Sequence, residues 1–371
     1  MKILYYYPEL SNPMLQWQRV HIFDELKHHG VEFDLFNPLL MDDIDEAQEK
    51  LIKMFDEGEY VLFMTCLCNN NHIRKTTVEE IKRKGVPTLS FRPDNLAIPF
   101  NDKEMATTFD LLWLTSKQTK YLYDKWGAKS VFVPYAANPY RYVYHKLPIT
   151  RRVCFIGNPH GSRASIINSI TSCQLPIDMY NGGKKNNEDN QDAIIPKWSI
   201  ASAGTISVIR TRLKFHEGRE MLRGALLEKI KGAETIIKND NLNNYPGLTF
   251  EEMIEKYSEY VLSLSFSSYA KTDALKKSIP VVNLRNFEIP MCGGLQICRY
   301  SDEMADYFED GKEAVLYRSD DEKIDKIRYY LNTAKESEIR TMKEAARKRC
   351  ENEHSWSCRF SKVFQELGIR F

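Results

Sequence analysis

The chain has 371 residues, which is longer than one ordinary hydrophobic core, and we expect two domains. Lys plus Arg (52) nearly equals Asp plus Glu (51), and this balance excludes wholesale nucleic-acid binding, which needs a strong basic excess. With 43% hydrophobic residues the composition is globular, and the longest apolar run, 60–68, is only about half of a membrane span.

The eight cysteines lie mostly in apolar segments. They form neither a CxxC pair nor a Cys/His ligand spacing, so we expect no zinc site and reduced thiols that pack as small hydrophobic groups. The N-terminus opens directly into an apolar strand without a signal-peptide layout. These features predict a cytoplasmic protein, and they leave open a peripheral attachment to the inner membrane face.

The first part of the chain alternates short apolar runs with helical periodicity. Each apolar run of four to six residues predicts a strand, and the helices fall between them: 2–7, 31–36, 60–65, 88–91, 111–115 and 130–133. Strands that alternate with helices indicate βαβ units and a parallel sheet. The sequence therefore predicts a doubly wound, Rossmann-like lobe.

The pattern breaks near 138–151, where prolines interrupt it, and then restarts with a strand at 152–156. Later apolar strands at 260–266 and 295–298 belong to the same second lobe. We therefore predict an α/β fold of two Rossmann-like lobes that face a central cleft. The predicted boundaries are an N-terminal lobe, a C-terminal lobe with an insertion near 184–248, and a final helix that can return to the N-terminal lobe: 1–145, 146–350 and 351–371.

The strongest local signal is the segment 283–297, in which Glu288 is expected to start a short helix and Gly293-Gly294 leads into a strand. A carboxylate there can accept hydrogen bonds from the vicinal hydroxyls of a ribose, and paired glycines let backbone approach a phosphate closely. Two other interpretations stay open. The glycines fit an ordinary tight turn, and Glu288 fits a helix start favoured by the dipole.

Phe-Glu-Ile-Pro-Met-Cys-Gly-Gly (287–294), followed by Tyr-Phe-Glu-Asp-Gly-Lys-Glu-Ala-Val (307–315), resembles the CgeB-like, spore-maturation branch of the group-1 glycosyltransferases. His354-Ser-Trp-Ser-Cys-Arg359, Phe91-Arg-Pro-Asp94 and the strand with Gly157 and Arg163 fit the same pattern. The resemblance covers about two-thirds of the chain on this matching, and 184–248 has no place in it.

The resemblance implies a GT-B fold, a nucleotide-diphosphate sugar held mainly by the C-terminal lobe, an acceptor on the N-terminal side, and neither a metal nor a cofactor. It also implies that Glu288 binds the donor ribose and that Gly293-Gly294 passes near the diphosphate. The chain departs from the group-1 pattern at Pro280, where many members carry a second Glu that contacts the sugar. Sugar recognition and stereochemistry therefore stay open.

Without a metal, arginines must neutralise the leaving diphosphate. Arg163, in the loop that follows Gly157, is the first candidate and Arg285 the second, although both also fit solvated surface positions. Asp94 follows the strand at 88–91 and is the candidate catalytic base for the acceptor hydroxyl. Its Pro-Asp-Asn context is also turn chemistry.

Two further motifs have a structural and a functional interpretation. Asp43-Ile-Asp45 resembles a metal-binding Asp-x-Asp, yet it stands at a helix start, where the dipole explains it. The basic segment 210–231 is either a membrane or acceptor surface or a packed helix with a solvated basic side, and we favour the packed helix.

We predict a hexosyltransferase-type enzyme that transfers a sugar from a nucleotide-diphosphate donor to a cell-surface glycan, glycolipid or protein. A nucleotide-sugar 2-epimerase needs the same nucleotide clamp, and a non-catalytic nucleotide-sugar-binding protein would carry it without turnover. The sequence leaves these two alternatives open, together with the identity of the sugar, the base and the acceptor.

Overall fold

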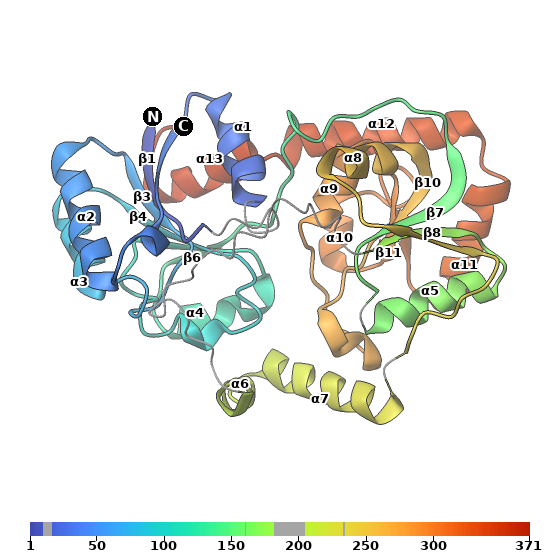
Figure 1. Ribbon diagram of the computed structural model, residues 1–371, viewed down its shortest axis with the longest axis horizontal. Coiled ribbons are helices and arrows are strands. Elements are labelled where there is room, and N and C mark those ends of the chain that lie inside the picture. Colours follow the sequence, from blue (N-terminus) through green and yellow to red (C-terminus); the bar gives the residue numbers. More distant parts are fainter. Residues whose placement is uncertain (10–16, 160, 182–204, 233) are drawn as a thin grey trace. The chain divides into compact units, whose positions relative to one another are not determined.

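The computed structural model describes residues 1–9, 17–159, 161–181, 205–232 and 234–371. They form two compact units, and Figure 1 shows the strands of each unit at its centre with helices around them. Unit 1 comprises 1–134, 187–219 and 356–371, and unit 2 comprises 135–186 and 220–355. Residues 184–204 of the predicted insertion lie outside the described residues.

Unit 1 is built on a six-stranded sheet of order β2-β1-β3-β4-β5-β6, in which every pairing is parallel. Its central strands are fully buried apolar runs, as expected for a sheet covered by helices on both faces. The strands are β1 Lys2–Tyr6, β2 Glu32–Phe36, β3 Leu62–Thr65, β4 Thr88–Arg92, β5 Leu111–Leu114 and β6 Ser130–Phe132.

The helices of unit 1 follow the strands in alternation. They are η1 Arg19–Phe23, α1 Asp24–Lys27, η2 Pro38–Leu40, α2 Ile44–Glu57, α3 Lys75–Arg83, η3 Pro99–Asn101, η4 Lys117–Thr119, α4 Lys120–Lys125, α6 Thr205–Arg212 and α13 Trp356–Leu367. Asp43 is the N-cap of α2, where its carboxylate accepts the Glu46 N–H at 2.8 Å. This contact supports the helix-start interpretation of the Asp-x-Asp sequence.

The last helix of the chain, α13, packs into unit 1. The buried carboxylate of Glu25 accepts the backbone N–H groups of Trp356 and Ser357 at 3.1 and 2.7 Å. The buried ring of Trp356 lies 6.0 Å from Trp113. Hydrogen bonding at the helix start and aromatic packing along its apolar face thus hold the C-terminus against the first sheet.

Unit 2 repeats the architecture with a parallel sheet of order β12-β11-β10-β7-β8-β9. Its strands are β7 Thr150–Ile156, β8 Ile177–Asn181, β9 Leu242–Pro246, β10 Tyr260–Leu264, β11 Gln296–Arg299 and β12 Val315–Tyr317. Its helices are α5 Ser162–Ser172, α7 His216–Lys231 (whose first turn belongs to unit 1), α8 Phe250–Glu259, η6 Ala270–Ala274, α9 Arg285–Met291, α10 Asp302–Tyr307, α11 Asp320–Asn332 and α12 Glu336–Glu353.

The two six-stranded parallel sheets confirm the predicted α/β fold, with local differences. The basic segment 210–231 falls on two helices, α6 and α7, and the buried ring of Phe215 between them packs on Phe100. Strand β9 was not predicted, because it is a polar, largely exposed edge strand without an apolar pattern. Between β10 and α9, Pro280 forms an isolated bridge with Ser268.

Both sheets change winding direction at a definable point. The chain of unit 2 starts in β7, moves outward to β8 and β9, and returns to β10 on the other side of β7. Unit 1 does the same between β1 and β3. In open parallel sheets, ligands bind outside the carboxyl ends of the strands at this switch point. The candidate ligand-binding positions are therefore the loops that leave β7 and β10 in unit 2 and β1 and β3 in unit 1.

Candidate functional site

The carboxyl end of β7 in unit 2 brings two arginines together. Gly157 follows the strand with φ 141°, and a Cβ there would lie 3.1 Å from Nη1 of Arg285. That same nitrogen donates to the carbonyl of Ile156, the last residue of β7. Glycine at this position therefore admits the Arg285 side chain from α9 to the strand end.

Arg163 reaches the same edge from the first turn of α5. Its guanidinium donates to the Asn158 carbonyl at 3.2 Å and lies 5.2 Å from the centroid of the Phe266 ring, which follows β10. Burial lowers the pKa of Arg163, and the neighbouring Arg285 lowers it further, while Asp273 opposes the shift. The electrostatic repulsion between the two guanidiniums favours an anion beside them.

Glu288 completes a cluster that we call the arginine site: Gly157, Arg163, Arg285 and Glu288. Its side chain is buried, with Oε2 4.0 Å from Nε of Arg285. Glu288 was expected to start its helix, but α9 begins three residues earlier, at Arg285. The two residues therefore stand one turn apart on the same face of α9, so that a carboxylate and a guanidinium are presented together.

Tyr142 was missed by sequence reasoning, although its hydroxyl donates to Oε1 of Glu288 at 2.7 Å. It belongs to the connecting segment 135–149, most of which falls in the predicted break near 138–151. A contact across 146 positions leaves no local pattern.

The surrounding atoms leave no room for a side chain at Gly293 or Gly294. Gly293 has φ 69°, and a Cβ there would lie 2.1 Å from the ring of Tyr144. A Cβ at Gly294 would meet the Tyr257 carbonyl at 2.9 Å. Close packing therefore accounts for both glycines, and their expected approach to a diphosphate stays a prediction.

The start of α5 carries a second group of side chains that sequence reasoning did not find. A Cβ at Gly161 (φ 60°) would lie 2.8 Å from Oε1 of Glu228 on α7, and Glu228 also pairs with Lys271 at 2.6 Å. Ser162 donates to Asp273 at 2.5 Å. Helix α7 and the η6 segment therefore lie against the loop that leaves β7, beside Arg163.

Asp94, the candidate base, lies in unit 1 at the exit of β4. It is exposed and has φ 55°, and its N–H donates to Oγ1 of Thr115 at 3.1 Å, beyond the end of β5. The next residue, Asn95, is buried and accepts the N–H groups of Thr115 and Ser116. These bonds hold the Asp94 backbone in the left-handed region, which Asp tolerates better than most residues.

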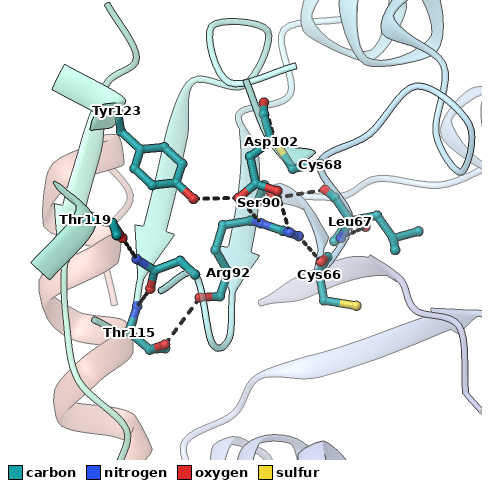
Figure 2. Close-up of polar contacts among 11 residues, drawn as sticks. Cys66, Leu67, Cys68, Ser90, Arg92, Asp102, Thr115, Thr119 and Tyr123 are labelled. Atoms are coloured by element: carbon teal, nitrogen blue, oxygen red, sulfur yellow. Dashed lines mark hydrogen bonds and ion pairs between the residues drawn. The ribbon is translucent and has the colours of Figure 1, made fainter. Parts of the chain in front are cut away.

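Figure 2 shows how the loops that leave β3 and β4 are joined by polar contacts. The Arg92 guanidinium donates twice to the buried carboxylate of Asp102, at 2.9 and 2.6 Å, and also to the carbonyl of Cys66. Tyr123 donates to the same carboxylate at 2.6 Å. The buried Asp102 carboxylate is therefore satisfied by partners within unit 1.

Among the described residues, no group of three or more His, Cys, Asp or Glu side chains is arranged to hold a metal ion. Within the same part of the chain, no helix is both long and apolar enough to cross a membrane.

Residues 219–365 match a family model described as glycosyl transferase-like. This segment runs from α7 through α12 into α13 and includes Arg285 and Glu288. Residues 219–365, which are less than half of the chain, are thus similar to a glycosyltransferase domain. A search of curated protein sequences gives no match.

Solved structures with the same fold cover almost the whole chain. Sucrose-phosphate synthase from Thermosynechococcus elongatus is 12% identical, with 99% of this chain and 98% of that chain covered and a TM-score of 0.55. Anabaena Alr3699/HepE in complex with UDP-glucose is 11% identical, with 99% of each chain covered and a TM-score of 0.56. AviGT4, a glycosyltransferase involved in avilamycin A biosynthesis, is 12% identical, with 100% and 98% covered and a TM-score of 0.54. The chain has the two-lobed GT-B fold of these proteins.

Proposed function

We propose that the protein transfers a sugar from a nucleotide-diphosphate donor to a hydroxyl acceptor, and that unit 2 binds the donor at the arginine site. The observation that carries the proposal is the pair Arg163 and Arg285 at the β7/β10 switch point, beside the carboxylate of Glu288. A nucleoside diphosphate offers this site both an anion for the guanidiniums and a ribose diol for the carboxylate.

The proposed chemistry follows from where charge develops. Cleavage of the bond between the sugar and the diphosphate places negative charge on the leaving phosphate. Arg163 and Arg285 stabilise that charge, with further help from the N–H groups at the start of α5. Asp94 accepts the proton of the acceptor hydroxyl. We propose that the reaction needs no divalent metal, since two guanidiniums supply the positive charge.

Uridine is the proposed base. A protein of this fold, Anabaena HepE, is described in complexes with UDP and with UDP-glucose, and this likeness supports the choice. We also propose the CgeB-like branch for the chain, on the motifs at 287–294 and 307–315. Pro280 stands in place of a second Glu, so other side chains must recognise the sugar. We propose Glu228 on α7 and Asp273 on η6, which lie beside the start of α5.

The proposed acceptor is a cell-surface glycan, glycolipid or protein. We also propose that the protein attaches peripherally to the cytoplasmic face of the membrane. Ile206, Ile209 and Leu213 expose their side chains at helical spacing on α6 and just beyond it. Residues 205–214 carry Arg210, Arg212 and Lys214 and no carboxylate. Apolar side chains beside unopposed basic ones suit an anionic lipid surface. Cosedimentation with anionic vesicles but not with zwitterionic ones is expected, and equal behaviour with both would contradict the attachment.

The first test is thermal unfolding against a panel of nucleoside diphosphates and nucleotide sugars. A ligand that binds only the folded state at 100 times its Kd adds about 2.7 kcal/mol of stability. We expect a selective shift with uridine diphosphates, which persists in EDTA, and about 1–3 kcal/mol weaker binding in Glu288→Ala. No shift with any nucleotide at millimolar concentration would refute donor binding.

Turnover separates the proposed transferase from its alternatives. Release of nucleoside diphosphate that depends on an added acceptor is expected of the wild type and should be lost in Asp94→Asn. Exchange of the C2 hydrogen of the sugar with solvent would instead identify an epimerase. Binding without either reaction would identify a nucleotide-sugar-binding protein.

A further inference from the structure

Tyr142 contacts Glu288 within the interior of unit 2. Tyr142 is 2% exposed and Glu288 is 7% exposed, and the hydrogen bond between Tyr142 Oη and Glu288 Oε1 is 2.7 Å long. This length is ordinary for a hydroxyl that donates to a carboxylate oxygen. A tyrosine hydroxyl occupies one of the about four acceptor positions of a carboxylate, so one such bond still permits a carboxylate to receive a ligand.

The direction of this hydrogen bond is fixed. Burial raises the pKa of Tyr142 well above its ordinary value, and the charge of Glu288 raises it further. The phenol therefore keeps its proton throughout the neutral range, and Tyr142 always presents a donor to Oε1.

Tyr142 is itself held from behind. Its N–H donates to the Asn138 carbonyl at 3.0 Å, and its carbonyl accepts from the Arg347 guanidinium. Its ring packs edge-on against Phe250 at 5.2 Å. Arg347 also donates to the Met291 carbonyl at the end of α9, so that one guanidinium joins the connecting segment to the helix that carries Glu288.

We propose that Tyr142 is the positioning residue for Glu288, and that it orients the carboxylate to receive the vicinal hydroxyls of the donor ribose. This inference rests on the proposed function and adds a residue from the connecting segment to it. A glutamate side chain has several rotamers, and a fixed hydroxyl donor selects one of them before the ligand binds. Tyr142 thus contributes to recognition of the diol without contacting the nucleotide.

The test is the Tyr142→Phe variant, titrated calorimetrically with UDP and with 2′,3′-dideoxyuridine diphosphate. The wild type should bind UDP more tightly, because only UDP offers the diol. In Tyr142→Phe, UDP affinity should fall about tenfold, and affinity for the dideoxy analogue should not change. The ratio of the two affinities then falls towards one, a change that general loss of structure would not produce.

Tyr330→Phe is the matched control. Tyr330 is also a buried tyrosine of unit 2, and its hydroxyl contacts the thioether of Met342 at 3.5 Å. Its removal should leave both affinities unchanged. A Tyr142→Phe variant that keeps the wild-type ratio, or that loses both ligands equally, would overturn the positioning role while the donor site stands. A wild type that binds neither nucleotide would overturn the donor site and this inference together.

Discussion

The carboxyl edges of the two sheets use buried charge in opposite ways. In unit 1, the Arg92 guanidinium forms a bidentate ion pair with the carboxylate of Asp102. Tyr123 donates a further hydrogen bond to that carboxylate (Figure 2). In unit 2, Arg163 and Arg285 are neighbours at the strand end, and the pKa of Arg163 is lowered by burial and by Arg285. The edge of unit 1 is complete in itself. At the edge of unit 2, Tyr257 and Glu288 raise the pKa of Arg285. The lowered pKa of Arg163, in contrast, favours an added anion.

The partners of each guanidinium distinguish structural from functional arginines in the two similar units. A buried guanidinium with a bidentate carboxylate serves the fold, because loss of either partner leaves an uncompensated charge. A guanidinium held at a switch point by carbonyls and an aromatic ring keeps its charge available to a ligand. Three variants test whether the distinction holds.

The largest expected effect is that of Asp102→Ala, which should lower the free energy of unfolding of unit 1 by about 3–5 kcal/mol. All five tryptophans lie outside the two segments of unit 2, so tryptophan fluorescence in a urea titration reports unit 1. The control is Asp124→Ala, which removes an exposed pair with Lys120 at 2.6 Å and should cost about 0–1 kcal/mol. Equal effects of the two variants would contradict a structural role for the Arg92 pair.

Glu25 sharpens the comparison inside unit 1, because this buried carboxylate is met by the N–H groups of Trp356 and Ser357. Burial raises its pKa to about 7, against the backbone hydrogen bonds and the Arg359 charge, which lower it. From about pH 4.5 to pH 7 the folded chain keeps a proton that the unfolded chain has lost, so stability falls as the pH rises through this window and is level above it.

The expected loss between the two ends of that window is about 3 kcal/mol, at about 1.4 kcal/mol for each unit of pKa. Glu25→Gln should remove this part of the pH dependence of the tryptophan-monitored urea midpoint. An unchanged pH profile in the variant would show that another group titrates.

The fold was predictable because strands such as β3, β5 and β10 are continuous apolar runs that stand out in any window. Edge strand β9, with the sequence Leu-Asn-Asn-Tyr-Pro, gave no such signal. Gly157, Arg163, Arg285 and Glu288 were named from the sequence, by motif and by position after strands. The structure adds that Arg285 meets the carbonyl before Gly157 across 129 positions.

What the sequence could not supply is the set of contacts that hold these residues. Tyr142 and Glu228 belong to a connecting segment and an inserted helix, where no periodic pattern or motif marks a partner. Their roles depend on distances between side chains that are far apart in the chain. The sequence therefore indicates which residues could bind a ligand, and the fold decides how each one is oriented.

The smallest effect is the one that separates the two edges most directly. Arg163→Met should weaken UDP binding by about 1.5–3 kcal/mol, the usual contribution of a hydrogen bond to a charged group. It should leave the unfolding of ligand-free unit 2 unchanged or make it harder, because it removes a half-buried charge next to Arg285. Calorimetry measures the first quantity, and hydrogen exchange of unit 2 peptides measures the second.

Arg328→Met on α11 is the control, since Arg328 is exposed and pairs with Asp325 at 3.0 Å. It should change neither quantity by more than about 0.5 kcal/mol. If Arg163→Met instead destabilised unit 2 and left UDP binding intact, Arg163 would serve its unit as Arg92 does. Arg163 and Arg92 would then both be structural residues, and Arg285 alone would bind the diphosphate.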